Sequence, residues 1–428
     1  MTGTAGRTQG FRARQRRRGR VRVLATSLSG LALVGVVGLW IAVNRVAWLG
    51  PYVADGLRAV IGVDAVASLE DFAYRVQDRV NRVWRRGEKP RAYWAVPSGA
   101  HERAPAPIPL LAAPPAPAAD EEIPPFRPRD VGPVLKEWSA PGDGEWVPMT
   151  DPDRPDDAVS MMKTLLHPDK SRSWAEVFVV AIDLRRVRLH LVAGTKEPAA
   201  TEDAALEMVR PGVIPEEHRA RVLAAFNGGF KTEHGQYGMF TEGTLLVKPR
   251  PGTCAVAAYD DGTMRVATWD KLEQNASSML FWRQTPVCMY ENDVLHWRLS
   301  DPTLARKWGA TLDGETVIRR SAIGIDRSGQ ILFVSISNHT TARVIADGMH
   351  HAGAVTVAQL DVNYSYPKFV TFERKKAPGE EAKRIAIPLA DGFEFSEDEY
   401  IREKNRRDFF YVMPKDADTR TAMKNRSR

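Results

Sequence analysis

The sequence predicts an α/β (α+β) fold built on a large mixed, partly antiparallel sheet with flanking helices. Residues 321–338 form two apolar runs around Asp326-Arg-Ser-Gly329, a polar stretch typical of a β-hairpin turn. Residues 341–353 then place apolar side chains at helical spacing and end at a glycine, and residues 355–360 form another apolar strand. Asp361 follows where this strand ends, a position at which α/β sheets commonly place chemistry.

A transmembrane helix is predicted to precede this fold. Residues 1–22 contain eight arginines and no acid, and residues 23–44 carry no charge, a length sufficient for a bilayer core of ~30 Å. A cleaved signal peptide is the alternative, although its apolar core is usually only ~7–15 residues long. The arginines indicate a basic cytoplasmic tail, a single-pass anchor in the inner (cytoplasmic) membrane and a periplasmic domain beyond Arg45.

The formal charge of +7 belongs to this tail rather than to the rest of the chain. Without residues 1–22 the sum is 7 − 8 = −1. A nucleic-acid-binding domain carries its positive charge on its own surface, so the sequence argues against a nucleic acid partner.

Two segments are predicted to connect the anchor to the domain. Residues 45–86 hold a juxtamembrane amphipathic helix, with apolar residues at helical spacing over 69–84 and arginines between them. This helix either lies on the membrane surface, pairs with a partner helix, or packs on the chain's own domain. Residues 87–133 contain twelve prolines and form a Pro/Ala-rich linker, interpreted as an extended spacer.

The distal domain is predicted over residues 134–413, followed by a charged tail at 414–428. Its elements are expected in an order that alternates β-rich runs with short helices, without an internal repeat. Strands are expected at 175–183, 187–193, 223–226, 243–248 and 409–413, and a hairpin at 254–269 that turns at Asp260-Asp-Gly262. Helices are expected at 202–209 and 215–222, and a charged loop at 374–392.

The two cysteines, Cys254 and Cys288, show no metal-ligand spacing. Either they form one disulfide in an oxidising compartment or they are two buried thiols. His350 and His351 are adjacent on the predicted helix and point about 100° apart, so they do not share a metal ion. No cofactor and no metal site are predicted.

A glycine-rich loop follows the apolar run at 223–226. Asn227-Gly-Gly229 permits a tight turn that brings backbone N–H groups close to a ligand, although Asn-Gly is also a common hairpin turn. The polar residues that follow, up to Gly238, are typical of an active-site loop.

These motifs resemble the phosphodiester glycosidase family. The resemblance covers roughly residues 175–372 and rests on Phe226-Asn-Gly-Gly-Phe230, Arg320-Ser-Ala-Ile-Gly324 and Leu360-Asp361 in that order. Family members continue the third motif with Gly-Gly-Gly-Ser, whereas this chain has Val-Asn-Tyr-Ser at 362–365, as in a divergent bacterial branch. Losing three glycines removes close backbone approach to a phosphate.

The resemblance implies a site for a sugar phosphodiester. Asp361 is the expected catalytic carboxylate, Arg320 the cation for the phosphate oxygens, and Asn227 the group that orients the substrate. An Arg320 neighbour would lower the pKa of Asp361. The alternatives are an Asp361 that caps a turn, an Arg320 at a solvated strand edge and an Asn227 that only turns the chain. Further substrate-binding candidates are Gly228, Gly229, His234, His339, Asn363 and Glu242.

Three functions follow from these patterns. The first is a membrane-anchored, outward-facing hydrolase that cleaves a glycosyl-phosphodiester linkage of an envelope glycan. The second is a non-catalytic glycan-binding or scaffolding domain on the same fold, because the Asp361 loop lacks the glycines. The third is an envelope assembly factor that acts through the chain's own amphipathic helix at 69–84, where a partner helix could bind. Tryptophans 282, 297 and 308 are candidates for stacking on sugar rings, with core packing as the default.

Overall fold

The structure is a computed structural model that describes Gly38 and residues 63–96, 123–301, 308, 316–363, 366–376 and 382–415. The chain divides into two compact units, Met1–Val66 and Ala67–Arg428. All contacts discussed below lie within the second unit. The predicted anchor at 23–44 lies outside the described residues, apart from Gly38. In the described part of the chain, no helix is long and apolar enough to cross a membrane.

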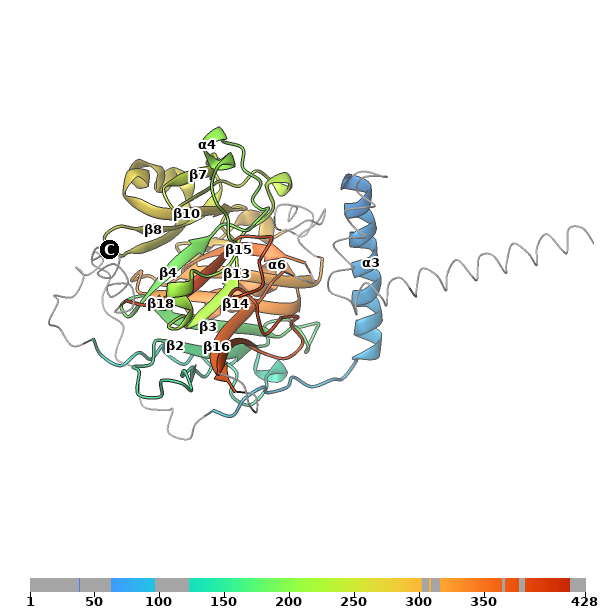
Figure 1. Ribbon diagram of the computed structural model, residues 1–428. Coiled ribbons are helices and arrows are strands. Elements are labelled where there is room, and N and C mark those ends of the chain that lie inside the picture. Colours follow the sequence, from blue (N-terminus) through green and yellow to red (C-terminus); the bar gives the residue numbers. More distant parts are fainter. Residues whose placement is uncertain are drawn as a thin grey trace, which may run out of the picture. The chain divides into compact units, whose positions relative to one another are not determined.

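The second unit is mainly β and holds three sheets (Figure 1). Every pairing between its named strands is antiparallel, so the expected mixed sheet is corrected to three antiparallel sheets. A single large sheet was expected because sequence patterns predict strands but not the sheet to which each strand belongs.

The first sheet has eight strands and contains the hairpin predicted around Asp326. In sheet order the strands are β1 (Val147–Pro148), β2 (Met161–Leu166), β3 (Val177–Asp183), β14 (Ile331–Thr340), β13 (Ile318–Ile325), β15 (Thr356–Val362), β11 (Tyr290–Glu291) and β12 (Val294–Leu295). The β13–β14 hairpin and β15 confirm the strands expected between residues 321 and 360.

The other two sheets have five strands each. In order, the second comprises β7 (Thr244–Val247), β6 (Met239–Thr241), β10 (Met279–Thr285), β8 (Cys254–Tyr259) and β9 (Met264–Thr268). The third comprises β17 (Lys383–Pro388), β16 (Phe369–Lys375), β5 (Ala224–Asn227), β18 (Phe409–Pro414) and β4 (Val187–Val192). Cys254 and Cys288 form a disulfide at one end of the second sheet, which is one of the two alternatives left by the sequence.

A shared apolar core joins the three sheets. It includes Phe178 of β3, Ile323 of β13, Phe226 of β5, Phe410 of β18 and Val256 of β8, all fully buried or nearly so. The contacts of Asp361 described below arise where the end of β15 meets the loop that follows β5.

The opposite face of the first sheet is covered by helix α6 (Ala342–His351), whose Ile345 and Met349 are buried against β3 and β13. Thr341 caps this helix by accepting a hydrogen bond from the Val344 N–H at 3.2 Å. Gly353, with φ of 115°, ends the segment in a conformation that favours glycine. The helix predicted over 341–353 is therefore confirmed.

The remaining helices are short, except for α3 (Val63–Trp84). The helices expected at 202–209 and 215–222 shrink to single turns, α4 (Asp203–Leu206) and α5 (Glu216–Arg219). The 3₁₀ turns are η1 (Lys136–Trp138), η2 (Thr232–His234), η3 (Trp269–Lys271), η4 (Glu273–Ser278) and η5 (Trp297–Leu299).

The charged loop expected at 374–392 is wrong in part. Its residues 383–388 form β17, which pairs with β16 at the edge of the third sheet. Edge strands carry charged residues because one side of their backbone faces solvent, and the charges at 383 and 384 hid the strand pattern.

The proline-rich linker is held at both ends by the second unit. The Tyr93 hydroxyl donates to Glu176 at 2.6 Å before residues 97–122, which lie outside the described part. After them, Arg186 donates to the carbonyl oxygens of Ile123 and Pro124. The two described ends of the predicted linker therefore both contact the sheets of the second unit.

Candidate functional site

Asp361 lies at a β-bulge near the end of β15. Ala322 pairs with Gln359 and Arg320 with Val362, so two residues of β15, Leu360 and Asp361, lie opposite Ser321. Bulges redirect side chains and are common beside active sites. The Asp361 N–H is not used in the β13 ladder; it donates to the Gly228 carbonyl at 3.0 Å. The bulge therefore joins the first sheet to the glycine loop that follows β5.

The Asp361 carboxylate is buried and faces one cation. Its Oδ1 accepts from the Val362 N–H at 2.9 Å, and its Oδ2 contacts the guanidinium of Arg407. Burial raises the pKa of Asp361 to about 6, against the lowering effects of Arg407 and the Val362 N–H. A carboxyl group with this pKa exchanges its proton near neutral pH, as a general acid or base must.

Asn227 and Asp361 are brought together through a serine. The Asn227 Nδ2 donates to Ser321 Oγ at 2.8 Å, and Ser321 Oγ donates to the Asp361 carbonyl at 2.8 Å. The Asn227 Oδ1 accepts from the Lys368 N–H at 3.1 Å. Asn227 thus holds the loop and the bulge in register, and its amide is occupied by protein groups.

Gly228 and Gly229 approach a buried ion pair rather than an open ligand position. Their N–H groups donate to Asp408, at 2.9 Å to its carbonyl and 2.8 Å to its Oδ2. A Cβ on Gly228 would lie 2.2 Å from Asp408 Oδ2, and one on Gly229 would lie 2.7 Å from Arg283 Cζ. The expected cradle of free N–H groups is therefore corrected: these glycines make room for the Asp408–Arg283 pair, whose side chains are fully buried.

Arg320 is not the cation beside Asp361. Along a strand, successive side chains point to opposite faces. Arg320 shares the face of Ala322, which packs under α6, whereas Ser321 shares the face of Ile323 in the shared core. The Arg320 guanidinium donates to the carbonyl oxygens of three residues and to a side-chain amide: Thr340 at 3.1 Å, Trp308 at 2.5 Å, Thr316 at 3.0 Å and Gln359 Oε1 at 3.2 Å.

One expectation is wrong as a result. Arg320 does not neighbour Asp361, so the condition for a lowered pKa of Asp361 is not met, and burial raises that pKa instead. The residue that sequence reasoning missed is Arg407, whose guanidinium also lies over the Tyr366 ring, 3.8 Å from its centroid. The available signal was Arg406-Arg407-Asp408 directly before the strand at 409–413, where charges precede a buried strand.

The other predicted site residues fall into two groups. His339 and Asn363 lie on the α3 side: the Asn363 Oδ1 accepts from the Tyr74 hydroxyl at 3.0 Å. Burial lowers the pKa of His339 to about 4, with Arg85 and Arg319 acting in the same direction. His234 lies in η2 with its Nε2 3.4 Å from Glu233, and Glu242 occupies the exposed turn between β6 and β7. No hydrogen bond or ion pair within the described part of the chain joins Glu242 to Asp361.

The candidate sugar-stacking tryptophans are mostly core residues. Trp282 is buried against Trp269, with ring centroids 4.6 Å apart, and Trp308 is buried and donates to the Val287 carbonyl at 2.9 Å. Only Trp297 of these three is exposed. Within the described ranges, no group of three or more His, Cys, Asp or Glu side chains is placed to hold a metal ion.

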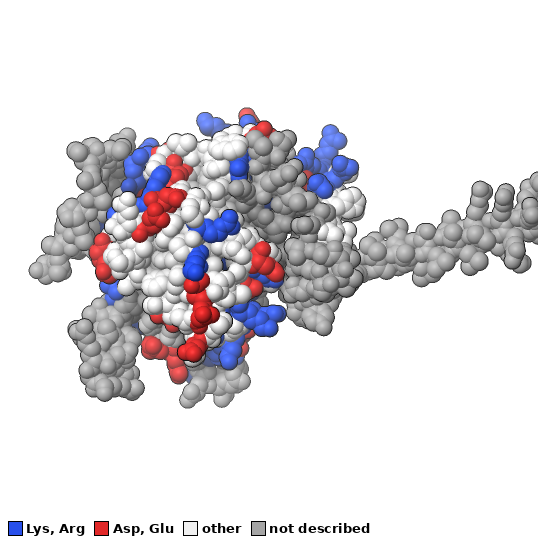
Figure 2. All heavy atoms as spheres, turned by 90° about the horizontal axis from the view of Figure 1, so that it is seen from above, with Lys and Arg blue, Asp and Glu red and all other residues white. Residues whose placement is uncertain are grey.

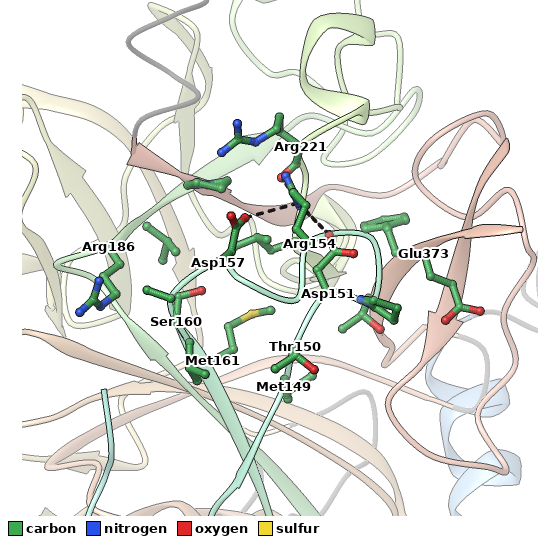
Figure 3. A pocket seen from close by; sticks show the side chains of 18 residues that line it. Met149, Thr150, Asp151, Arg154, Asp157, Ser160, Met161, Arg186, Arg221 and Glu373 are labelled. Atoms are coloured by element: carbon green, nitrogen blue, oxygen red, sulfur yellow. Dashed lines mark hydrogen bonds and ion pairs between the residues drawn. The ribbon is translucent and has the colours of Figure 1, made fainter. Parts of the chain in front are cut away.

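A cavity of about 360 Å³ lies at the opposite end of the third sheet (Figure 3). Leu223, before β5, and Pro414, at the end of β18, line it, whereas Asn227 and Asp408 lie at the other ends of those segments. Its most prominent charged group, Arg154, is paired with Asp151 at 2.6 Å and with Asp157 at 3.5 Å. No predicted site residue lines this cavity.

The comparisons with known proteins give distant structural similarity. No family model matches this chain, and no curated protein matches it. Among similar solved structures is a hypothetical protein from Synechocystis, with 10% identity, a TM-score of 0.34 and coverage of 60% of this chain and 62% of that one. Another is a Burkholderia pseudomallei protein named "putative exported protein", with 12% identity, a TM-score of 0.29 and coverage of 56% and 74%. The chain thus spans less than two thirds of the length of the first.

Proposed function

We propose that this chain is a membrane-anchored, outward-facing hydrolase that cleaves a glycosyl-phosphodiester linkage of an envelope glycan. The observation that carries the proposal is Asp361, a buried carboxyl group at a β-bulge, with its pKa raised to about 6, beside the guanidinium of Arg407. Cleavage of a glycosidic bond needs a carboxyl group of this kind, and a guanidinium complements phosphate oxygens. Arg407 takes the role that the sequence resemblance assigned to Arg320.

The compartment part of the proposal has separate support. The Cys254–Cys288 disulfide is typical of proteins in an oxidising environment such as the periplasm. The uncharged stretch at 23–44, preceded by arginines, supports an anchor with the sheets outside. Acidic and basic side chains are interspersed over the face seen in Figure 2, which fits a partner other than nucleic acid.

Non-catalytic glycan binding is the second candidate. It is favoured by the enclosure of the site: the Asp361 side chain is only 5% exposed, and the N–H groups of Gly228 and Gly229 are already bonded to Asp408. For the hydrolase, this enclosure means that the chain beside Asp361 must move to admit the substrate.

The test is turnover by the full chain in detergent micelles. A synthetic N-acetylglucosaminyl phosphodiester is the first substrate in a panel of sugar phosphodiesters, and free sugar is followed over time. Asp361→Asn should abolish release, whereas Asp398→Asn, which removes an exposed carboxylate paired with Arg402, should leave it unchanged. A folded wild-type chain that releases no sugar from any member of the panel would overturn the proposal and favour glycan binding.

A further inference from the structure

Helix α3 presents its polar face to the sheets. The Tyr74 hydroxyl donates to Asn363, and Asp78 accepts two hydrogen bonds from Arg172, at 2.7 Å and 2.8 Å. Near the helix end, the Arg85 guanidinium lies over the Trp174 ring, 5.5 Å from its centroid. Residues 74, 78 and 85 lie within about 40° of each other on a helix of ~100° per residue, so they define one face.

The opposite face of α3 is apolar and exposed. Six large apolar side chains there are between 46% and 88% exposed: Leu69, Phe72, Val76, Val80, Val83 and Trp84. Their positions fall within an arc of roughly 120°, centred opposite the docked face. An amphipathic helix on a globular domain normally turns its apolar stripe toward the core, and this helix does the reverse. Such a continuous exposed stripe marks a surface for a partner or a membrane.

A row of arginines borders this apolar face along one side. Arg75, Arg79, Arg82 and Arg86 are exposed and fall roughly 80–140° to one side of the centre of the stripe. Arg82 is paired with Asp78 at 3.0 Å and still has half of its side chain in solvent. The surface that covers the apolar stripe therefore also meets a line of positive charge.

A second copy of this helix does not complement that charge. In an antiparallel pair of helices the two arginine rows would face each other, and like charges in that arrangement repel. In a parallel pair the row would meet the other border of the stripe, where Gln77, Asn81 and Glu70 offer one acidic group for four arginines. An anionic lipid surface supplies both an apolar layer for the stripe and negative headgroups for the arginines.

We infer that α3 lies on an anionic lipid surface, with its apolar face in the headgroup–acyl boundary, its arginine row on the headgroups and its polar face holding the sheets. Trp84, the most exposed of the apolar residues, is of a type enriched at membrane interfaces. The uncharged stretch at 23–44 ends shortly before α3 begins at Val63, so an anchored chain brings this helix to the same lipid surface.

This placement names a substrate class. Tyr74 of α3 is bonded to Asn363, two residues beyond Asp361, so the Asp361 loop adjoins the helix that meets the lipid. Resting on the proposed hydrolase function, we assign as substrate a glycosyl phosphodiester carried by a membrane lipid, rather than a soluble one.

The experiment uses the full chain reconstituted into vesicles. Because both native cysteines are in the disulfide, a single introduced cysteine can be labelled selectively with an environment-sensitive fluorophore. Val80→Cys puts the label on the apolar face, and Ser328→Cys, in the exposed β13–β14 turn, is the matched control. Vesicles contain phosphatidylcholine alone or with phosphatidylglycerol, and a lipid-borne nitroxide reports contact with the bilayer.

The label at residue 80 should be quenched in vesicles with phosphatidylglycerol, and the label at residue 328 in neither kind. Replacing Arg79 and Arg86 by glutamine should lower the ratio of lipid-bound to unbound α3 about 30-fold, at roughly 1 kcal/mol per arginine. No quenching at residue 80 in anionic vesicles would overturn the inference. Energy transfer between donor- and acceptor-labelled copies at residue 80, without quenching, would assign the face to a second copy instead.

Hydrolysis is measured in the same vesicles with lipid-carried and soluble phosphodiesters. Faster release from the lipid-carried substrate supports the substrate class, and equal rates contradict it. Quenching does not depend on turnover. Quenching at residue 80 without any sugar release would therefore refute the hydrolase proposal and still support the binding of α3 to lipid.

Discussion

Arg407 contacts the carboxylate of Asp361 across two sheets, from a position 46 residues further along the chain. Asp361 lies near the end of β15 in the first sheet, and Arg407 lies just before β18 in the third. The adjacent Asp408 pairs with Arg283 of β10 in the second sheet. The candidate site is thus the point at which all three sheets meet, and its charges are fixed by the packing of separate sheets.

Asp361 should make stability depend on pH in an unusual direction for a carboxyl group. Its pKa in the folded chain is about 6, above the ordinary aspartate pKa of 3.8, so the folded state holds this proton more tightly than the unfolded state. The stability that the protonated Asp361 contributes to the folded state is fully present below about pH 4 and is lost as pH rises through about 6. Relative to Asp361→Asn, the wild-type free energy of unfolding should fall by up to about 3 kcal/mol over this window.

Urea denaturation at several pH values measures this difference. Asp398→Asn, an exposed and paired carboxylate, should give a curve parallel to that of the wild type. A constant offset between wild type and Asp361→Asn from pH 4 to pH 7 would show that the folded carboxyl titrates as it does in the unfolded chain.

Arg407→Gln should raise the pKa of Asp361 further. The guanidinium lowers that pKa, and its removal leaves burial unopposed by this charge. If Asp361 acts in turnover, the limb of the pH–rate profile that it controls moves to higher pH in Arg407→Gln. Arg407→Lys keeps the positive charge and should move the limb less. Equal shifts in the two variants would mean that the shape of Arg407, rather than its charge, sets the proton affinity.

Gly228→Ala should prevent folding or cost at least ~3 kcal/mol, since its Cβ would lie 2.2 Å from Asp408 Oδ2 in a fully buried ion pair. Gly243→Ala is the control, because its Cβ meets nothing within 4 Å and only its φ of 73° opposes the change. We expect the control to cost about 1 kcal/mol. Thermal unfolding of both variants makes the comparison; equal costs would remove the steric argument for Gly228.

Arg320→Met should destabilise the fold without a selective effect on any catalytic step. The change leaves the carbonyl oxygens of Thr316, Thr340 and Trp308 without the Arg320 donor, and each buried unsatisfied group costs ~1–3 kcal/mol. The measurement pairs urea denaturation with the pH–rate profile of the folded fraction. A stable Arg320→Met chain with an altered profile would return Arg320 to the catalytic role that the sequence resemblance implied.

The first sheet was predictable where local pattern decides structure. The turn at Asp326, the helix after Thr341 and the apolar run up to Leu360 each follow from residues close in sequence, and all three were confirmed. The position of Asp361 at the end of a buried strand was also predictable. Its partner was not, because the contact with Arg407 depends on which sheet each strand joins.

The paired arginines at 319 and 320 show the same limit within one strand. Sequence treats them as one basic feature, yet the strand turns them to opposite faces. Arg319 pairs with Glu394 beside the Phe393 ring, and Arg320 is buried under α6. The packing on each side of the strand decides which arginine points toward the candidate site. Neither Arg319 nor Arg320 reaches Asp361.

His339 should make α3 sensitive to acid. Burial lowers its pKa to about 4. Arg85, directly after α3, and Arg319 of β13 act in the same direction, whereas Asp78 of α3 raises the pKa. The neutral imidazole therefore stabilises the fold above about pH 6.5, and this contribution is lost as pH falls through about 4. This is the opposite sign to Asp361, so single variants are needed to separate the two.

Hydrogen exchange of α3 amides, corrected for the intrinsic pH dependence of exchange, measures the effect. From pH 7 to pH 4.5, wild-type α3 should lose more protection than α3 of His339→Gln, which stays neutral. His350→Gln, on α6, is the control and should behave as the wild type. Equal loss of protection in wild type and His339→Gln would show that protonation of His339 does not oppose the docking of Tyr74 and Asp78, and that acid acts on α3 through another group.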